Sequence, residues 1–182
     1  MPRRWYVLLL AAIGAGRLWE LRMSREHERA RGGRRAAAST YPVMVGAHIA
    51  LLTLPLLEVS RRPGRAPNPF WLGVLGAAVA LRVWSIRTLG DSWNARAAVP
   101  DNLEPVTGGP YRFVRHPNYV AVILEFAAIP LVAGAWRSAI ALSILNAAVL
   151  ADRITAEERL LEASPAYRQA FAGRARFIPG VV

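Results

Sequence analysis

The chain has 182 residues, 54% of them hydrophobic, and a formal net charge of +11 at pH 7, because 23 arginines and no lysines stand against 12 acidic residues. This length fits one domain and leaves little room for a second. The absence of cysteine excludes disulfides and thiolate zinc sites. The apolar residues lie in long blocks with the arginines mainly between them, which is typical of a membrane protein. A soluble nucleic-acid binder would interleave basic and apolar residues at helical or strand period.

Five apolar blocks predict an all-α, polytopic integral membrane protein with about five transmembrane helices. The blocks cover residues 5–21, 41–59, 70–86, 119–133 and 136–150. Each is near the ~20 residues that cross a ~30 Å hydrocarbon core. The last two are separated only by Gly134 and Ala135, which predicts a tight helical hairpin.

The helix of the fifth block is expected to continue past Leu150 through the charged run DRITAEERLLE. We therefore expect a single membrane domain over residues 1–182. Residues 1–86 would hold the first three spans, and residues 87–182 would hold a polar loop, the hairpin and a C-terminal helix.

The distribution of arginine predicts the orientation. With five spans, 15 of the 23 arginines fall in the loop after the first block, the loop after the third block and the C-terminal tail, whereas six fall on the opposite side. Basic loops stay in the cytoplasm, so the N-terminus is expected outside and the polar segments at the cytoplasmic face. The first block also resembles a signal peptide, but Arg17 and Glu20 occupy the region where cleavage would occur.

The segment of residues 89–119, LGDSWNARAAVPDNLEPVTGGPYRFVRHPNY, carries most of the polar and aromatic groups. Its prolines and its Gly108–Gly109 pair exclude a continuous helix, so an ordered loop leading into the fourth span is predicted. Pro117 suits the first turn of that span. Free backbone N–H groups there favour an anion, and aromatic rings can hold a sulfonium. The alternative is a belt of Tyr, Trp and Arg at the membrane interface, which does not require the constrained His116–Pro117 pair.

A polar stripe is predicted along the fifth helix. Asn146, Leu150, Arg153 and Glu157 follow one another at i, i+4, i+7 and i+11, so they share one face. The alternative is a solvated helix end with an i,i+4 ion pair.

Glu125 lies inside the fourth block, on the face that also holds Asn118. A charged side chain in a span costs about 2.5 kcal/mol or more, so Glu125 marks either a functional group or a structural pair with Arg82, Arg17 or His48. For the other ionisable residues within the spans, which are Arg17, Glu20, His48 and Glu58, pairing between spans is the expectation.

The motifs GPYRFVRHPNYV and DRITAEERLLEASPAYRQAF, separated by the hairpin, resemble the isoprenylcysteine carboxyl methyltransferase family of integral membrane enzymes. The resemblance covers roughly residues 82–182. It implies that the loop and the hairpin enclose S-adenosylmethionine near the cytoplasmic face, without a Rossmann domain. The implied cofactor contacts are Arg96, Val106, Tyr111, His116, Pro117, Asn118, Tyr119 and Glu157. Arg153 matches an arginine that places the acceptor.

The sequence resembles a bacterial branch of this family more closely. This closer resemblance rests on three segments: RLWELRMSREHERARGG, LRVWSIRTLGDSWNAR and RHPNYVAVILEFAAIPL. That branch includes enzymes that O-methylate alkylpyrones or alkylresorcinols, whereas the eukaryotic enzymes esterify a prenylated cysteine carboxylate. This sequence departs from the family pattern at Glu125 and Arg96. These differences put the prenylcysteine acceptor in question, but not the use of the cofactor.

The sequence thus predicts an S-adenosylmethionine-dependent O-methyltransferase of the bacterial inner membrane with a lipophilic acceptor, either a phenol or enol or a prenylcysteine-type carboxylate. Arg153, Glu125 and His116 are the candidate catalytic residues. A phenol or enol needs a general base, for which Glu125 is the first candidate and His116 the second. A carboxylate needs none, and Arg153 could orient it. A membrane-embedded NADPH-dependent reductase and a non-enzymatic scaffold or transporter subunit are the alternatives. Neither a metal nor a nucleic-acid partner is expected.

Overall fold

The computed structural model describes residues 4–31, 34–36, 39–62, 64–99 and 103–179. Its helices are α1 (Arg4–Arg31), α2 (Tyr41–Ser60), α3 (Pro69–Leu89), α4 (Pro117–Val132), α5 (Trp136–Leu161) and α6 (Pro165–Ala170). Two 3-10 turns, η1 (Gly90–Ser92) and η2 (Gly109–Arg112), and two short antiparallel strands, β1 (Arg34–Arg35) and β2 (Ala98–Val99), complete this part of the chain. The predicted all-α class is confirmed.

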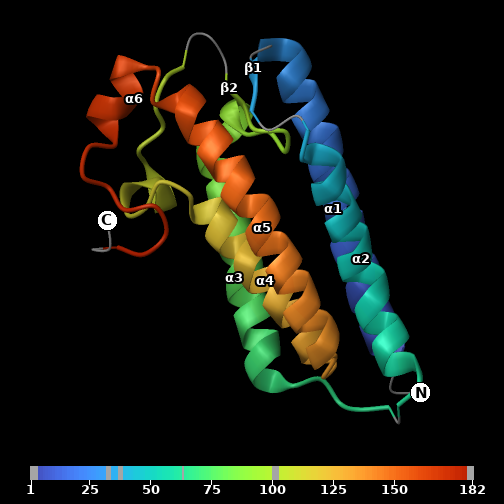
Figure 1. Ribbon diagram of the computed structural model, residues 1–182. Coiled ribbons are helices and arrows are strands. Elements are labelled where there is room, and N and C mark those ends of the chain that lie inside the picture. The colour runs from blue at the N-terminus through green and yellow to red at the C-terminus, as the bar shows by residue number, and fades with distance from the viewer. Residues whose placement is uncertain (1–3, 32–33, 37–38, 63, 100–102, 180–182) are drawn as a thin grey trace.

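In Figure 1, α3, α4 and α5 run side by side as one group, with α1 and α2 along the other side of the molecule. Helix α2 packs against α5 and α4 as well as against α1. One end of the molecule holds the two strands, α6, the C-terminal end of α5 and described parts of the loop between α3 and α4, and α1 begins at the other end. Helices α4 and α5 form the predicted hairpin, turning through Gly134 with a φ of 75°. This arrangement brings the polar loop and the charged end of α5 together.

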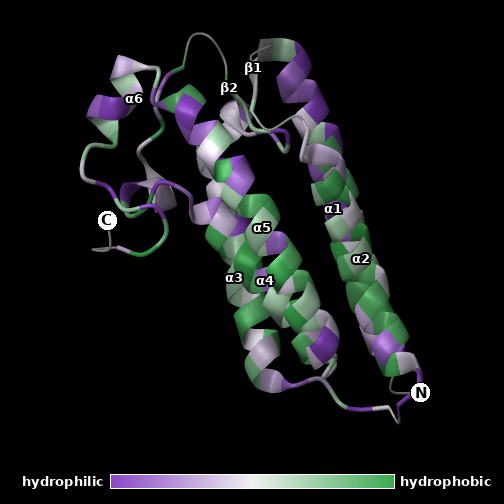
Figure 2. Cartoon of the chain, in the orientation of Figure 1, coloured by the Kyte–Doolittle hydropathy of each residue, from purple (hydrophilic) through white to green (hydrophobic). Residues whose placement is uncertain are grey.

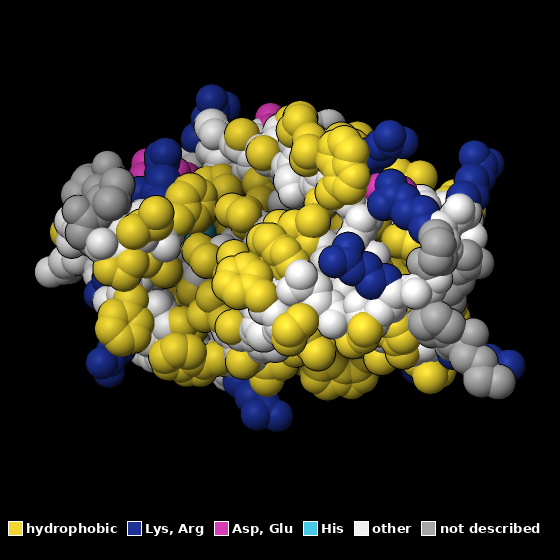
Figure 3. Space-filling model, turned by 90° about the horizontal axis from the view of Figure 1, so that it is seen from below, with side chains coloured by type: hydrophobic (Ala, Val, Ile, Leu, Met, Phe, Trp, Pro, Cys, Tyr) yellow, Lys and Arg dark blue, Asp and Glu magenta, His cyan; other side chains and the backbone are white. Residues whose placement is uncertain are grey.

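Hydrophobic residues occupy the middle of the long helices, and hydrophilic residues gather at the end that holds β1, β2 and α6 (Figure 2). Among the described residues, α2, α3 with η1, and α5 are long and apolar enough to cross a membrane, while α4 is apolar but shorter. Large apolar side chains such as Leu8, Ile49 and Ile144 are more than half exposed. The lower end of the bundle in Figure 1, where α1 begins and α4 turns into α5, shows many hydrophobic side chains with arginines mainly around the edge (Figure 3). Exposed apolar side chains on long apolar helices suit lipid, and the chain is an integral membrane protein. Five spans and their orientation stay predictions.

Helix α1 is longer than the first apolar block, since it continues past residue 21 to Arg31. The extension, residues 22–31, was expected to be part of a loop, but its sequence RMSREHERAR is rich in good helix formers. This polar half of α1 supports the α3–α4 loop: the Ser24 hydroxyl accepts a hydrogen bond from the Ala95 N–H at 2.9 Å, and His27 Nδ1 donates to the Trp93 carbonyl at 2.7 Å.

The apolar core is centred on α4, of which Phe126 and Ile129 are fully buried against Leu51 of α2, Leu75 of α3 and Leu142 of α5. Helix α1 joins this core through its first turns, where the buried Tyr6 hydroxyl donates to the Ile129 carbonyl at 3.0 Å. The remaining contacts of α1 with α3 and α4 include ion pairs in the middle of the helices, described below.

Candidate active site

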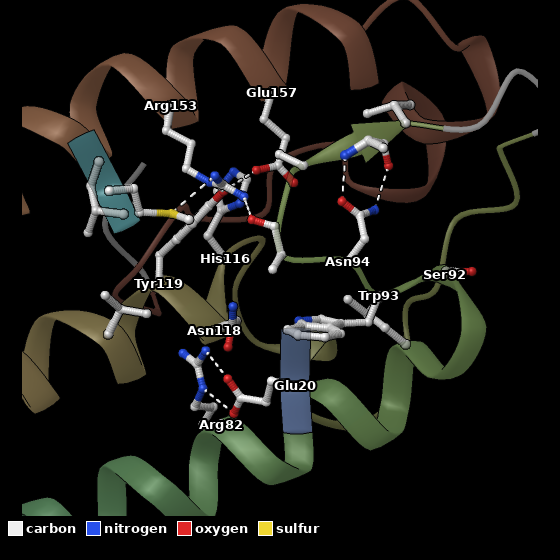
Figure 4. Close-up of a pocket in the computed structure, with 18 of the residues that line it drawn as sticks. Glu20, Arg82, Ser92, Trp93, Asn94, His116, Asn118, Tyr119, Arg153 and Glu157 are labelled. Atoms are coloured by element: carbon white, nitrogen blue, oxygen red, sulfur yellow. Dashed lines mark hydrogen bonds and ion pairs between the residues drawn. The ribbon is translucent and has the colours of Figure 1, made fainter. Parts of the chain in front are cut away.

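A cavity of about 490 Å³ lies among α1, α2, the α3–α5 group and the α3–α4 loop. Its volume falls within the ~300–1,000 Å³ typical of ligand pockets. Seven of the residues that the sequence singled out line it, from the loop, from α4 and from the stripe of α5: Val106, Tyr111, His116, Asn118, Tyr119, Arg153 and Glu157. Asn146 and Leu150 of the same stripe line it as well. The motifs on either side of the hairpin therefore meet at one cavity (Figure 4).

Asn94 folds the first part of the loop. Its Oδ1 accepts from the Ala98 N–H at 2.6 Å and from the Arg96 N–H at 3.1 Å, while its Nδ2 donates to the Ala98 carbonyl at 2.8 Å. These bonds hold a tight turn in which Ala97 has a φ of 49°, an unusual value for a residue with a side chain. The neighbouring Trp93 is buried and lines the cavity, so this turn forms a preorganised wall.

The second part of the loop is fixed at Gly109. Its φ is 52°, and a Cβ at this position would lie only 2.4 Å from Oγ1 of Thr88 on α3, so only glycine fits. Two residues later, Tyr111 packs with Tyr167 and Phe171 in a small buried cluster at the end of the cavity. Burial raises the pKa of both tyrosines, so they remain neutral hydroxyls at physiological pH.

Arg153 of α5 connects several parts of the site. It is 4% exposed, and its guanidinium donates to the Tyr119 hydroxyl at 2.9 Å, to Met44 Sδ at 3.2 Å and to the Ala95 carbonyl at 2.6 Å. The Tyr119 hydroxyl in turn donates to Glu157 Oε2. Within the described ranges no carboxylate lies at ion-pair distance from Arg153. Its link to Glu157 runs through the Tyr119 hydroxyl, so the guanidinium on the cavity wall can still attract an anionic group.

His116 is held by a carboxylate that the sequence did not single out. Its Nε2 lies 3.1 Å from Oε1 of Glu158, and because an ionised carboxylate only accepts, Nε2 carries the proton. Glu158 also pairs with Arg115 at 3.3 Å and with Arg176 at 2.7 Å. The sequence does not reveal that the adjacent Glu157 and Glu158 have different partners. The helix directs Glu157 toward Tyr119 and Glu158 toward His116.

Glu125 does not line the cavity. It is 2% exposed, and its Oε2 lies 2.6 Å from Arg17 of α1 and 3.7 Å from Arg82 of α3. Glu20 of α1 joins the same two arginines, at 2.8 Å from Arg17 and 2.7 Å from Arg82. The structure therefore shows the ion-pair alternative for Glu125: two carboxylates and two guanidiniums alternate and fasten α1 to α3 and α4.

Arg96 and Pro117 also lie outside the cavity lining. The Arg96 guanidinium lies 3.4 Å from Glu28 and 5.1 Å from the ring centre of Tyr41, so it braces the loop against α1 and α2. Pro117 begins α4, as its sequence position predicted. Glu58 accepts from the N–H and the hydroxyl of Ser138, both at 2.7 Å, which links α2 to α5.

The lining also includes residues of α1 and α2 for which the sequence gave no role in the site: Arg17, Glu20, Met44 and His48. Three of them were visible only as polar interruptions of apolar blocks, for which pairing between spans was the expectation. Arg17 and Glu20 do pair with other helices, whereas His48 bonds to the carbonyl of Met44 in its own helix.

Comparisons with known proteins agree with this arrangement. The profile of the isoprenylcysteine carboxyl methyltransferase (ICMT) family matches residues 71–163, which include α3, the loop and the α4–α5 hairpin. The chain is also 33% identical over 161 residues to the uncharacterized protein YpbQ of Bacillus subtilis (strain 168), an alignment that covers 85% of this chain and 95% of that protein. The chain belongs to the isoprenylcysteine carboxyl methyltransferase family, which implies a membrane methyltransferase.

Proposed function

We propose that the chain is an S-adenosylmethionine-dependent O-methyltransferase that acts on a lipophilic acceptor at the cytoplasmic face of the bacterial inner membrane. The acceptor is a phenol or enol, such as an alkylpyrone or alkylresorcinol, or a prenylcysteine-type carboxylate. The observation that carries this proposal is that the α3–α4 loop and the α5 stripe, with His116 and Glu157, line one cavity. Use of S-adenosylmethionine as a general property of the family supports it.

The cavity lining fits this cofactor. Glu157 uses Oε2 for Tyr119, and no donor to its Oε1 is found in the part of the chain that the structure describes, so Oε1 is available to a ligand hydroxyl or ammonium. The rings of Trp93, Tyr111 and Tyr119 offer π faces to a sulfonium. When bound, the cofactor supplies a methyl group on a positively charged sulfur.

The protein's own contribution is alignment and exclusion of water, which can lower the barrier by several kcal/mol. Arg153 can hold an acceptor oxygen, because its charge faces the cavity without an ion-pair partner among the described residues. Apolar side chains of α1 and α2 continue the cavity beyond Arg153, and they suit an alkyl or prenyl tail: Leu18, Leu21, Val45, Ile49 and Leu52.

The family match does not favour an NADPH-dependent reductase. The proposal is tested with the purified protein in nanodiscs, by isothermal titration with S-adenosylmethionine and NADPH in parallel. Transfer of a radiolabelled methyl group is then measured on a panel of alkylresorcinols, alkylpyrones and prenylcysteines. We expect binding of S-adenosylmethionine and transfer to at least one acceptor class. Binding of NADPH alone would refute the proposal.

A further inference from the structure

We propose that His48 is the catalytic base for a hydroxyl acceptor, so that the site is built to methylate a phenol or enol oxygen rather than a carboxylate. This inference rests on the proposed function and deepens it. His48 takes the place of Glu125 as the candidate base, because of where its side chain lies on α2 and which of its ring nitrogens is free in the described structure.

The imidazole of His48 is held in one tautomer. Its Nδ1 lies 2.9 Å from the Met44 carbonyl oxygen, and because a carbonyl only accepts, Nδ1 carries the proton. In the neutral ring Nε2 then keeps its lone pair. His48 lines the cavity, and in the described part of the chain no side chain or main-chain group is hydrogen-bonded to Nε2. Phe126 of α4 contacts the ring edge-on, at 5.2 Å between centres, and fixes its plane.

His48 lies close to Arg153 along the cavity wall. Met44 Sδ is 3.2 Å from Arg153 Nη1, and His48 follows Met44 by four residues, or about 5–6 Å along the helix. The next lining residues of α2 are Ile49 and Leu52, which are apolar. An acceptor whose tail lies against Ile49 and Leu52 would thus place its polar head near both His48 Nε2 and Arg153.

The other two candidate bases are placed less favourably for the acceptor. Glu125 lies outside the cavity lining and is paired with Arg17 at 2.6 Å. The Nε2–H of His116 donates a hydrogen bond to Glu158, and His116 matches a cofactor contact implied by the family resemblance, so it is expected to face the cofactor rather than the acceptor. Among the described residues, His48 combines a place in the cavity lining, beside the apolar Ile49 and Leu52, with an Nε2 lone pair that no protein hydrogen-bond donor occupies.

In the proposed step the acceptor O–H bond breaks as its proton moves to His48 Nε2. The acceptor oxygen forms the bond to the methyl carbon, the carbon–sulfur bond breaks, and its electron pair stays on sulfur, which becomes a neutral thioether. The imidazolium then returns its proton to water, and no further reactant is needed. A carboxylate acceptor carries no such proton, so His48 would be idle.

The test compares the unmodified protein with His48→Gln, and with Thr53→Val as a matched control on an exposed position of the same helix. Two acceptors with the same alkyl tail are used: a resorcinol, which is protonated at the assay pH, and a nitrophenol, which is already ionised. General-base catalysis contributes about 10²–10⁴-fold, so His48→Gln is expected to lower kcat on the resorcinol by about 100-fold or more. On the nitrophenol the loss should stay within about threefold, because no proton has to be removed. Thr53→Val should behave as the unmodified protein.

Equal losses of kcat on both acceptors, or no loss on either, would overturn the role of His48. So would transfer to a farnesylcysteine carboxylate with none to either phenol, although the proposed function would then stand. Isothermal titration distinguishes failure of the His48 proposal from failure of the proposed function. His48→Gln should keep the affinity for S-adenosylmethionine. If the unmodified protein does not bind S-adenosylmethionine, the proposed function itself is refuted.

A second readout does not depend on activity. The protein has three histidines, so ¹⁵N-histidine NMR in micelles, assigned with single His→Gln variants, reports each tautomer. His48 is expected to show a protonated Nδ1 and a bare Nε2, and a phenol with the alkyl tail should shift the Nε2 signal. A protonated Nε2 with a bare Nδ1 would contradict the proposal.

Discussion

The Tyr119 hydroxyl on α4 accepts a hydrogen bond from Arg153 Nε on α5 at 2.9 Å and donates one to Glu157, one turn further along α5. One α4 residue thereby joins a cation and an anion of the other helix. Helices α4 and α5, which supply part of the cavity wall, are thus joined at the point where the cofactor is expected.

Tyr119→Phe should therefore weaken the binding of S-adenosylmethionine, because Arg153 and Glu157 lose their shared partner and reorient. A hydrogen bond to a charged group contributes about 1.5–3 kcal/mol, so a loss of affinity of about tenfold or more is expected by isothermal titration. Tyr6→Phe is the matched control, since it also removes a buried hydroxyl, 3.0 Å from the Ile129 carbonyl but outside the cavity lining. If Tyr6→Phe weakened binding as much as Tyr119→Phe, the local role of Tyr119 would be wrong.

Glu157→Gln should keep the fold but lower the affinity for S-adenosylmethionine by about tenfold or more, because the amide offers a weaker acceptor than the carboxylate. Asp152→Asn removes the same charge from an exposed position of α5 and should leave the affinity unchanged. Comparable affinities of the two variants would show that Glu157 does not contact the cofactor.

Glu125→Gln should destabilise the protein by about 3 kcal/mol, since it leaves buried arginines short of a counter-charge. The double variant Arg17→Met with Glu125→Met keeps the balanced Glu20–Arg82 pair, so it should cost much less than the sum of its single substitutions. Reversible unfolding in mixed micelles measures all three. Strict additivity of the two single substitutions would contradict the ion-pair cluster.

Gly109→Ala should destabilise the loop by about 1–3 kcal/mol, because a side chain is strained at a positive φ and its Cβ would collide with Thr88. Gly108→Ala is the neighbouring control, with a φ of −81° and open space around its Cβ. Thermal unfolding with and without S-adenosylmethionine checks both. Equal melting temperatures of the two variants would disprove the steric argument.

The sequence predicted the helices of the later chain well, because apolar blocks and prolines mark their limits. The hairpin, the start of α4 at Pro117 and the continuation of α5 past Leu150 all agree with the structure. The end of α1 was misplaced, since a solvated helix has no apolar period to reveal it, and its stability depends on contacts such as Ser24 with the loop.

The site was predictable where one motif or one helix face contains its members, as with His116, Tyr119, Arg153 and Glu157. The contributions of α1 and α2 depend on how distant helices pack, which no local spacing reveals. Arg17 and His48 both interrupt apolar blocks and both line the cavity, yet Arg17 is paired with Glu125 whereas His48 bonds only within its own helix among the described residues. Only the three-dimensional arrangement distinguishes a structural charge from a functional group.

The central claim is that the α3–α4 loop and the end of α5 close over one molecule of S-adenosylmethionine. Ultraviolet crosslinking of the radiolabelled cofactor to the intact protein, followed by mass spectrometry of its peptides, tests this most directly. We expect labelled peptides from both residues 103–119 and residues 153–161, with competition by unlabelled cofactor. Labelling restricted to other segments, or label that unlabelled cofactor does not displace, would contradict the account.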